Sequence, residues 1–346
     1  MTEPRPLSYA DAGVDIDAKM GAVARAKDAI RSTFTKGVVG DVGGFGGLFR
    51  PDFVGMTDPL LVASADGVGT KLKVAIAAGV HRTVGQDLVN HCVNDIHVQG
   101  ASPLFFLDYI ATGRMRPELV GEVLEGIAKA CRENGCALLG GETAEMPGMY
   151  AEGDYDLAGT IVGAVDRPKM LDGSRVSEGD LLIGLPSSGL HTNGYSLARK
   201  IFFEDLGLTP ATEVPEFSST VAAALLAVHR SYLKPVLPLV ENLCLSAMSH
   251  ITGGGFPDNL PRVLPAGLDA VVHPDAWSWP PLFKFLQEKG RVAPAEMLRV
   301  FNCGIGMVLI VPPARDLEVK SRLDGSREDW KQIGRVQKGA RTVRFV

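Results

Sequence analysis

The chain has 346 residues, of which 46% are hydrophobic and 22% are charged, and its formal net charge is −5. This length predicts about two domains, and the ordinary composition excludes a collagen-like or wholly disordered chain. An acidic balance without a long run of lysine and arginine predicts no nucleic-acid partner. No apolar stretch reaches the roughly 18 residues that span a bilayer, and the first residues do not resemble a signal peptide. We therefore expect a cytoplasmic protein with no membrane partner.

Cysteine and glycine give the next constraints, because the chain has five of the first and 40 of the second. The cysteines form no CxxC pair, which argues against a structural zinc or a disulfide framework and predicts reduced thiols. Glycine makes up about 12% of the chain, against a typical value of about 7%. Glycine permits sharp turns and close approach of the backbone to a ligand, so its clusters indicate where a site lies.

Hydrophobic periodicity and turn residues divide the first half of the chain into alternating elements. In chain order they predict a helix at 17–31, an irregular glycine-dense segment at 40–47, a strand at 60–65, helices at 72–78 and 83–99, a strand at 104–110, a helix at 117–134, a strand beginning at 137–139 and a strand at 156–165.

A charged, turn-rich stretch at 167–180 predicts a domain boundary, which we place at residue 170, giving domains 1–170 and 171–346. Beyond it the pattern predicts a strand at 181–185, a helix at 195–203, a largely helical run at 220–239, a helix at 279–289 and a strand at 307–311. Alternating strands and helices favour α/β or α+β layering, although the strand order cannot be read from them.

The segment Asp66-Gly-Val-Gly-Thr-Lys71 follows the apolar strand at 60–65. Its carboxylate, flexible backbone, hydroxyl and ammonium group suit Mg²⁺ and phosphate, although an ordinary strand-to-helix turn capped by Asp66 has the same sequence. The segment is not a Walker A motif, and Leu72 stands where a dinucleotide fingerprint needs its third glycine.

The helix predicted at 83–99 carries four polar residues on one face, at spacings of three, four and seven: Asp87, Asn90, His91 and Asn94. Such a stripe either faces solvent or lines a site. In the functional interpretation Asp87, Asn94 and the adjacent Asp95 join Asp66 around metal ions, because Mg²⁺ takes carboxylates, waters and phosphate oxygens.

Three later loops offer similar groups after apolar segments. Gly140-Gly-Glu-Thr143 supplies a carboxylate and a hydroxyl, although a turn acid is also a common structural feature. The segment 187–194, Ser-Ser-Gly-Leu-His-Thr-Asn-Gly, precedes a helix and suits a phosphate ester. His191 within it is either a general acid or base or a surface residue. The loop 250–255, His-Ile-Thr-Gly-Gly-Gly, is a further backbone cradle without an assigned role.

Taken together and in this order, these segments closely resemble the aminoimidazole ribonucleotide (AIR) synthetases, also called phosphoribosylformylglycinamidine cyclo-ligases. The resemblance covers essentially the whole chain. It rests on the segments 7–17, 43–46, 66–72, 92–95, 100–109, 140–150, 187–189, 250–256 and 301–304.

The resemblance implies that the chain converts ATP and formylglycinamidine ribonucleotide to aminoimidazole ribonucleotide, ADP and phosphate in purine synthesis, with Mg²⁺. Phosphorylation of the formyl oxygen makes a leaving group, and a neighbouring amidine nitrogen then closes the ring. The implied fold is the two-domain α/β (α+β) AIR-synthetase fold. An N-terminal ATP-binding sheet domain pairs in a homodimer, and an α/β domain follows it.

The resemblance also implies roles for individual residues. The catalytic residues would be Asp95, His191 and Lys71, and the metal ligands Asp66, Asp87 and Asp95. ATP and its phosphates would be bound by Lys27, Gly43, Gly44, Gly46, Gly47, Asp66, Gly67, Gly69, Thr70, Asn94, Glu142 and Thr143. The substrate would be bound by Ser188, Gly189, His191, Thr192 and Asn193. Asn90 and His91 match no motif of the family, so no function is expected of them.

Two other interpretations remain open from the sequence. One is a catalytically inactive nucleotide-binding or scaffold protein on the same fold, and the retained Asp66, Lys71, Asp95 and His191 argue against it. The other is a different ATP-dependent member of the superfamily, such as thiamine-monophosphate kinase, which lacks the segment 140–150 found here.

Overall fold

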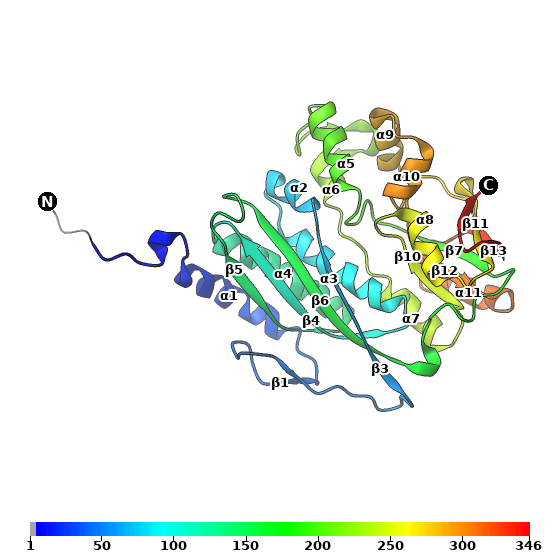
Figure 1. Cartoon of the computed structure of the whole chain (residues 1–346), viewed down its shortest axis with the longest axis horizontal. Helices are drawn as coiled ribbons and strands as arrows, with labels where there is room; N and C mark the ends of the chain where they lie inside the picture. Colours follow the sequence, from blue (N-terminus) through cyan, green and yellow to red (C-terminus); the bar gives the residue numbers. More distant parts are fainter. Residues whose placement is uncertain (1–4) are drawn as a thin grey trace.

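The computed structural model describes residues 5–346; residues 1–4, where the predicted N-terminal domain begins, lie outside the described part. The first half of the chain is built on a four-stranded sheet of order β3-β6-β4-β5 (Figure 1). Its strands are β3 (Pro59–Gly67), β4 (Ser102–Thr112), β5 (Ala137–Glu145) and β6 (Tyr155–Asp166). Only β4 and β5 are parallel, and α4 (Pro117–Asn134) makes the crossover that a parallel pair requires.

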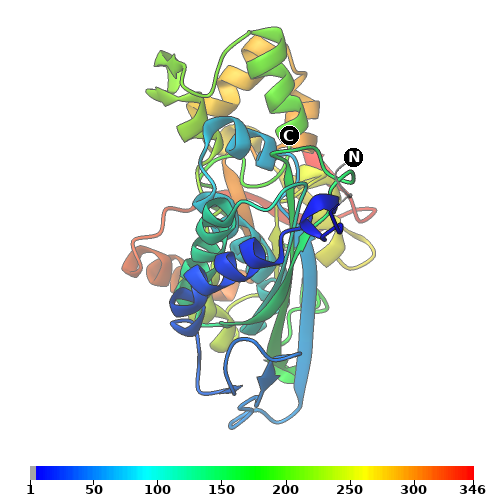
Figure 2. The same cartoon turned by 90° about the vertical axis from the view of Figure 1, so that its left-hand side faces the viewer.

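Helices cover one face of this sheet, as Figure 2 shows. They are α1 (Ile16–Arg31), α3 (Arg82–His97) and α4, while α2 (Lys71–Ala78) follows the end of β3. Helix α4 begins with Pro117 and is followed by Gly135, whose positive φ of 71° suits a glycine directly after a helix. No helix of residues 5–346 covers the opposite face of the sheet, where Leu61 and Tyr109 are 66% and 37% exposed.

Two glycines explain how closely α3 and α4 pack. A Cβ atom on Gly85 would lie 2.2 Å from the carbonyl oxygen of Val123, and one on Gly126 would lie 2.1 Å from that of Arg82. Neither distance is sterically possible, so any larger residue forces the helices apart. Part of the glycine excess therefore serves helix packing rather than ligand binding.

The second half of the chain is built on a six-stranded sheet of order β10-β12-β7-β13-β11-β14, antiparallel except between β11 and β14. Its strands are β7 (Leu181–Pro186), β10 (Ala247–His250), β11 (Leu268–Val272), β12 (Ile305–Val311), β13 (Lys331–Lys338) and β14 (Val343–Phe345). Helices pack around it, namely α5 (Tyr195–Arg199), α6 (Val221–Leu225), α7 (Leu233–Glu241), α8 (Gly255–Asn259), α9 (Pro281–Gly290), α10 (Pro294–Val300) and α11 (Asp316–Gly325).

Two short hairpins complete the strands, β1 (Val38–Val39) with β2 (Leu48–Phe49) and β8 (Glu213–Val214) with β9 (Ser219–Thr220). The β1–β2 hairpin carries the glycine-dense segment 40–47 as its loop. Helix α5 continues as one π-helical stretch, Lys200–Asp205. Within the described residues no helix has both the length and the apolar character needed to cross a bilayer.

The helix predicted at 117–134 is confirmed to the residue, and the other elements of the first half are confirmed with shifted ends. The largely helical run predicted at 220–239 is divided into two helices, α6 and α7. Helices α6 and α7 are separated by residues 226–232, because this stretch hydrogen-bonds to α3 instead of to itself. Strands β10, β11, β13 and β14 were not predicted.

Helix α3 lies at the junction of the two halves and is buried almost throughout. One continuous hydrophobic cluster includes Ile96 and Phe106 from the first half and Ile251 and Phe256 from the second. The polar stripe on α3 is therefore not a solvent-exposed face. It meets loops of the second half, and the candidate site lies at this junction.

Candidate active site

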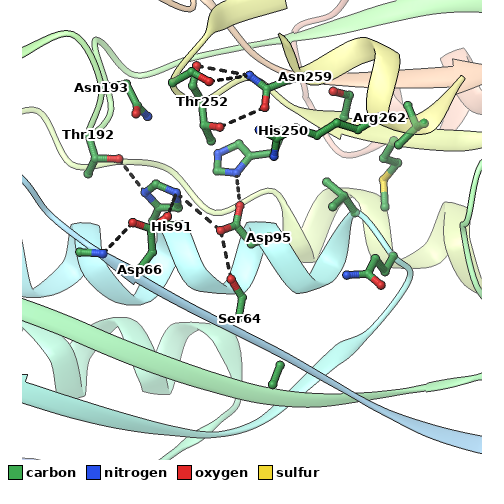
Figure 3. A pocket seen from close by; sticks show the side chains of 18 of the residues that line it. Ser64, Asp66, His91, Asp95, Thr192, Asn193, His250, Thr252, Asn259 and Arg262 are labelled. Atoms are coloured by element: carbon green, nitrogen blue, oxygen red, sulfur yellow. Dashed lines mark hydrogen bonds and ion pairs between the residues drawn. The ribbon is translucent and has the colours of Figure 1, made fainter. Parts of the chain in front are cut away.

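A cavity of about 810 Å³ lies between the two halves of the chain (Figure 3). The first half contributes the end of β3, the loop after it and one face of α3. The second half contributes two loops and the end of β10. Residues that line the cavity include Ser64, Asp66, Gly67, Gly69, His91, Asp95, Thr192, Asn193, His250, Thr252, Asn259 and Arg262.

Two carboxylates and two imidazoles interact directly in this cavity. Nε2 of His91 lies 2.9 Å from Oδ2 of Asp66 and 3.6 Å from Oδ2 of Asp95. Nδ1 of His250 lies 2.9 Å from Oδ1 of Asp95. Figure 3 shows these four side chains converging from β3, α3 and β10. The structure thus brings Asp66 and Asp95 together as expected and adds two histidines to them.

The electrostatics of this group favour an ionised Asp66–His91 pair. Burial lowers the pKa of His91, but the hydrogen bond to Asp66 and the charge of Asp95 outweigh it and raise that pKa above its ordinary value. Burial raises the pKa of Asp66, but the hydrogen bond from His91 outweighs it and lowers that pKa. In His250 burial dominates and lowers the pKa despite the contact with Asp95. The positive charge of His91 therefore partly compensates the negative charge that the carboxylates bring into the cavity.

Lys71 and Asp87 do not line the cavity. Nζ of Lys71 lies 2.7 Å from Oδ2 of Asp87, and both side chains have no exposed surface. The other two donors of the ammonium group go to the carbonyl oxygens of His191 and Ala227, at 3.1 and 2.8 Å. The second oxygen of Asp87 accepts from the backbone N–H of His229. Their polar atoms are thus engaged inside the protein in this arrangement, so the phosphate contact of Lys71 and the metal-ligand role of Asp87 stay predictions.

Asn94 is also occupied by the protein itself. Its amide nitrogen donates to the carbonyl oxygen of Arg230 and contacts Nε2 of His229, while its amide oxygen accepts from the N–H of Tyr232. Together with Asp87 it fixes residues 226–232 against α3. The direct ATP contact predicted for Asn94 is therefore not available in this arrangement.

His191 is only 1% exposed and lies beneath the cavity rather than in it. Its backbone has a positive φ of 62°, and its ring stacks on His229 with centroids 4.0 Å apart. Nε2 accepts from the N–H of Ser188, and Nδ1 has no hydrogen-bond partner. Burial holds the pKa of His191 well below its usual range, so the ring is neutral at pH 7. Its catalytic role stays a prediction.

The other predicted substrate-binding residues lie on the same loop as His191. Thr192 and Asn193 line the cavity, and Oγ1 of Thr192 lies 2.7 Å from Nδ1 of His91. Ser188 donates through its hydroxyl to the carbonyl oxygen of Val228, and the adjacent Gly189 has a positive φ of 150°, which favours glycine. Neither lines the cavity.

Most of the remaining predicted ATP residues line a second cavity of about 800 Å³. Here the β1–β2 loop, with Gly43, Gly44, Gly46 and Gly47, faces Glu142 and Thr143 of β5. Nζ of Lys19 lies 2.7 Å from Oε1 of the exposed Glu142. Burial, with the charge of Glu142, raises the pKa of Asp108 in this cavity to about 7. Lys27 lines neither cavity, and Thr70 lies next to Ser196, with their hydroxyl oxygens 3.1 Å apart.

The predicted ATP and metal residues are thus divided between two cavities, but these cavities are not isolated from each other. A shallow hollow of about 310 Å³ lies on the open face of the N-terminal sheet. It shares Asp66 with the interdomain cavity and Leu107 and Asp108 with the glycine-loop cavity. The hollow joins the two along the face that carries no helix.

Sequence reasoning missed three histidines. His91 was set aside because it matches no family motif, and His229 lies in a stretch that was predicted to be helical. His250 was predicted only as part of a glycine loop, whereas in the structure it is the last residue of β10. The contacts of His229 with α3 depend on pairing across 135 or more residues, which no local pattern contains.

Comparisons with known proteins agree with this architecture. The family model for the AIR synthase related protein, N-terminal domain, matches residues 52–165, and that for the C-terminal domain matches residues 177–346. The chain belongs to the AIR synthase related family. The boundary predicted at residue 170 falls between the two matched ranges and stays a prediction.

Relatives of nearly the same length have been named within this family. The chain is 51% identical to phosphoribosylformylglycinamidine cyclo-ligase of Syntrophotalea carbinolica, over 98% of this chain and 97% of that protein. It is 52% identical to the cyclo-ligase of Geobacter metallireducens, over 98% and 99%.

Solved structures share the fold at low sequence identity. Thiamine-monophosphate kinase from Stenotrophomonas maltophilia has a TM-score of 0.70 at 18% identity, covering 93% of this chain and 95% of that one. Hydrogenase maturation protein HypE, solved in complex with ATP, has a TM-score of 0.66 at 19% identity, covering 96% and 92%. These likenesses confirm the predicted two-domain α/β fold.

Proposed function

We propose that this chain is the ATP-dependent ligase that converts formylglycinamidine ribonucleotide to 5-aminoimidazole ribonucleotide, releasing ADP and phosphate. The observation that carries this proposal is the identity of about half of all residues, over nearly the whole length, with relatives named for this activity. The cavity supports it, because its carboxylates lie beside the loops that the substrate's phosphate would need.

The reaction can be written in two balanced steps. The formyl oxygen of the substrate attacks the γ-phosphorus of ATP, ADP leaves, and the formamide nitrogen loses its proton to solvent. The neighbouring amidine nitrogen then attacks the formyl carbon and gives up its proton, the C–O bond breaks, and inorganic phosphate leaves with the former formyl oxygen and that proton. Little covalent chemistry is left for the protein, whose task is to hold both molecules in line and to neutralise charge.

The interdomain cavity suits the reacting end of this chemistry. Asp66 and Asp95 supply carboxylate oxygens on one wall, and the loop carrying Thr192 and Asn193 lies on the other. The positive side chain of Arg262 and the backbone at Gly253 offer further contacts to a phosphate ester. His191, which belongs to this loop, is neutral and buried beneath the cavity. It therefore positions the loop and does not contact the solvent-filled space.

Mg²⁺ fits the oxygen donors of this cavity, because it is held in proteins by one or two carboxylates together with waters and phosphate oxygens. Asp66 and Asp95 would hold it, and the ion would neutralise charge that develops on the transferred phosphoryl group. Asp87 is left out of this proposed ligand set, because Lys71 and a backbone N–H already occupy its oxygens in this arrangement.

ATP would extend along the open face of the sheet from the glycine-loop cavity to Asp66. The shallow hollow supports this path, because it shares lining residues with both cavities. Glycine at position 47 allows the loop to approach β5, since a Cβ there would lie 2.4 Å from Cγ of Leu139. The loop would then close over the nucleotide with its backbone N–H groups.

A homodimer formed through this sheet face is the finer part of the proposal. Leu61 and Tyr109 are exposed on a face with no covering helix, and apolar faces of this kind mark association sites. Twofold dimers are also the commonest assemblies. The five buried cysteines are unpaired, which supports a place in the reducing cytoplasm.

The test is incubation of the purified chain with ATP, Mg²⁺ and formylglycinamidine ribonucleotide. We expect aminoimidazole ribonucleotide, ADP and phosphate in equal amounts. With ¹⁸O in the formyl group, we expect the label in the released phosphate. A folded chain that binds ATP and forms no product would instead indicate an inactive nucleotide-binding protein and would overturn the proposal.

A further inference from the structure

Asp66, His91, Asp95 and His250 place two carboxylates and two imidazoles around one region of the interdomain cavity (Figure 3). His91, Asp95 and His250 each offer one ligand atom, and these atoms lie within 4.8 Å of one another. Oδ2 of Asp66 lies 2.9 Å from Nε2 of His91, at the edge of this group. The function proposed above uses only the two carboxylates of this set.

The spacing of these atoms suits a metal ion. Bonds of about 2.1 Å place neighbouring ligand atoms about 3.0 Å apart in an octahedral site and about 3.4 Å apart in a tetrahedral one. The separations from Nε2 of His91 to the oxygens of Asp66 and Asp95 are 2.9 and 3.6 Å. Nδ1 of His250 lies 2.9 Å from Asp95. Only small side-chain movements are needed to surround an ion.

The two imidazoles are also supported in the way that metal-binding histidines usually are. His91 and His250 are 4% and 6% exposed, so burial restricts their rotation. The second nitrogen of His91 lies 2.7 Å from Oγ1 of Thr192, and that of His250 lies 3.0 Å from Nε2 of His229. Such partners orient a ligand ring and are a regular part of metal sites.

The donor set does not match Mg²⁺ alone. Mg²⁺ prefers oxygen, whereas imidazole together with carboxylate suits Zn²⁺, Co²⁺ and similar ions. We propose that Asp66, His91, Asp95 and His250 form a binding site for a transition-metal dication of the zinc type. The site fills without nucleotide, and its ion competes with Mg²⁺ for the two carboxylates.

A second cluster, of three histidines, is another candidate metal site, but the geometry of its rings excludes metal binding. Nitrogens of His191, His229 and His250 also lie within 4.8 Å of one another. However, the rings of His191 and His229 are stacked, with an angle of 13° between their planes. Two stacked rings cannot both direct an in-plane lone pair at one ion. His250 therefore contributes to the cavity site only.

The test uses the full-length chain freed of metals by a chelator, without ATP or substrate. Zn²⁺ and Co²⁺ are titrated separately, by calorimetry and by the visible absorption of Co²⁺. We expect one ion per chain, with Zn²⁺ bound at least about a hundredfold more tightly than Mg²⁺. His91→Gln and Asp66→Asn should each weaken Zn²⁺ binding at least about tenfold.

The matched control is His273→Gln, because His273 is an exposed histidine far from this cluster in the fold and should not alter binding. Far-UV circular dichroism checks that each variant is folded, and Asp66→Asn, at a half-exposed position, serves if His91→Gln fails that check. Equal Zn²⁺ affinity in the wild type and a folded variant would overturn the proposal, as would Zn²⁺ binding no tighter than Mg²⁺. Because the assay contains no ATP, its failure leaves the proposed ligase activity untouched.

Discussion

Two charged clusters meet α3 within two turns of each other, and they differ in what surrounds them. Lys71 and Asp87 form a pair with no exposed surface, in which protein groups occupy the polar atoms. Asp66, His91 and Asp95 line a cavity of about 810 Å³ and remain open on one side. The same residue types thus hold two halves of the chain together in one place and offer ligand atoms in the other. The two clusters differ in burial and in whether protein groups already occupy their polar atoms, and they do not differ in the type of charge.

The largest expected effect follows from breaking the buried pair. Asp87→Asn leaves the ammonium of Lys71 buried without its counter-charge and weakens the link to His229. Removing one partner of a buried pair typically costs about 3–5 kcal/mol, so we expect a loss of that order in the free energy of unfolding. Urea denaturation would measure it.

Glu125→Gln is the matched control for that change, because Glu125 of α4 pairs at the surface with Arg82 of α3, the helix that carries Asp87. Exposed pairs contribute about 0–1 kcal/mol, so this variant should differ little from the wild type. Equal stability of the two variants would remove the structural role assigned to Lys71 and Asp87.

Gly85→Ala tests whether glycine serves helix packing at the junction. The added Cβ meets the carbonyl oxygen of Val123, so α3 and α4 must separate, at a cost of about 1–3 kcal/mol. Gly121→Ala on α4 is its control, since a Cβ there meets nothing within 4 Å. That control should be neutral or stabilise the chain by up to about 1 kcal/mol. A thermal melt showing no difference between them would contradict the packing explanation.

Asp108 gives a pH dependence in the glycine-loop cavity. Burial raises its pKa in the folded chain to about 7, far above the unfolded value of 3.8. The folded state therefore holds the proton more tightly, and this carboxyl weakens stability as pH rises from about 4 to 7. Asp108→Asn should gain stability over the wild type by about 1–3 kcal/mol at pH 8 and much less at pH 4.5. A difference that does not change with pH would show that Asp108 is not shifted.

The smallest stability effect is expected at Glu142, whose pair with Lys19 is exposed. Glu142→Gln should change the free energy of unfolding by no more than about 0.5 kcal/mol. If ATP reaches this cavity, the same variant should raise the KM for ATP several-fold. Unchanged steady-state kinetics would place the nucleotide elsewhere.

The sequence predicted most of the N-terminal half because its signals are local. Helix 117–134 has proline at its start and glycine after its end, and both act within a few residues. Strand β13 (Lys331–Lys338) was not predicted, because its polar residues do not alternate cleanly with apolar ones. Its place in the sheet comes from pairing with β7 and β11, which are distant in sequence.

The candidate site was predictable only in part, for the same reason. Asp66 and Asp95 stand out because each lies in a motif beside an apolar element. Whether a carboxylate faces a cavity or a buried lysine depends on the other half of the chain, so the sequence could not show that Asp87 pairs with Lys71. His91 and His229 gain their significance from contacts with residues 25 to 142 positions away. No local pattern could supply that information.

The central claim is that the cavity carboxylates perform the chemistry while the buried pair holds the halves together. The most direct measurement is the kcat of Asp95→Asn at saturating ATP, Mg²⁺ and formylglycinamidine ribonucleotide, with Tm recorded on the same sample. Asparagine keeps the shape of Asp95 and loses only its charge. The account predicts a kcat lower by about a hundredfold or more with nearly unchanged Tm. A wild-type kcat in the folded variant would contradict it.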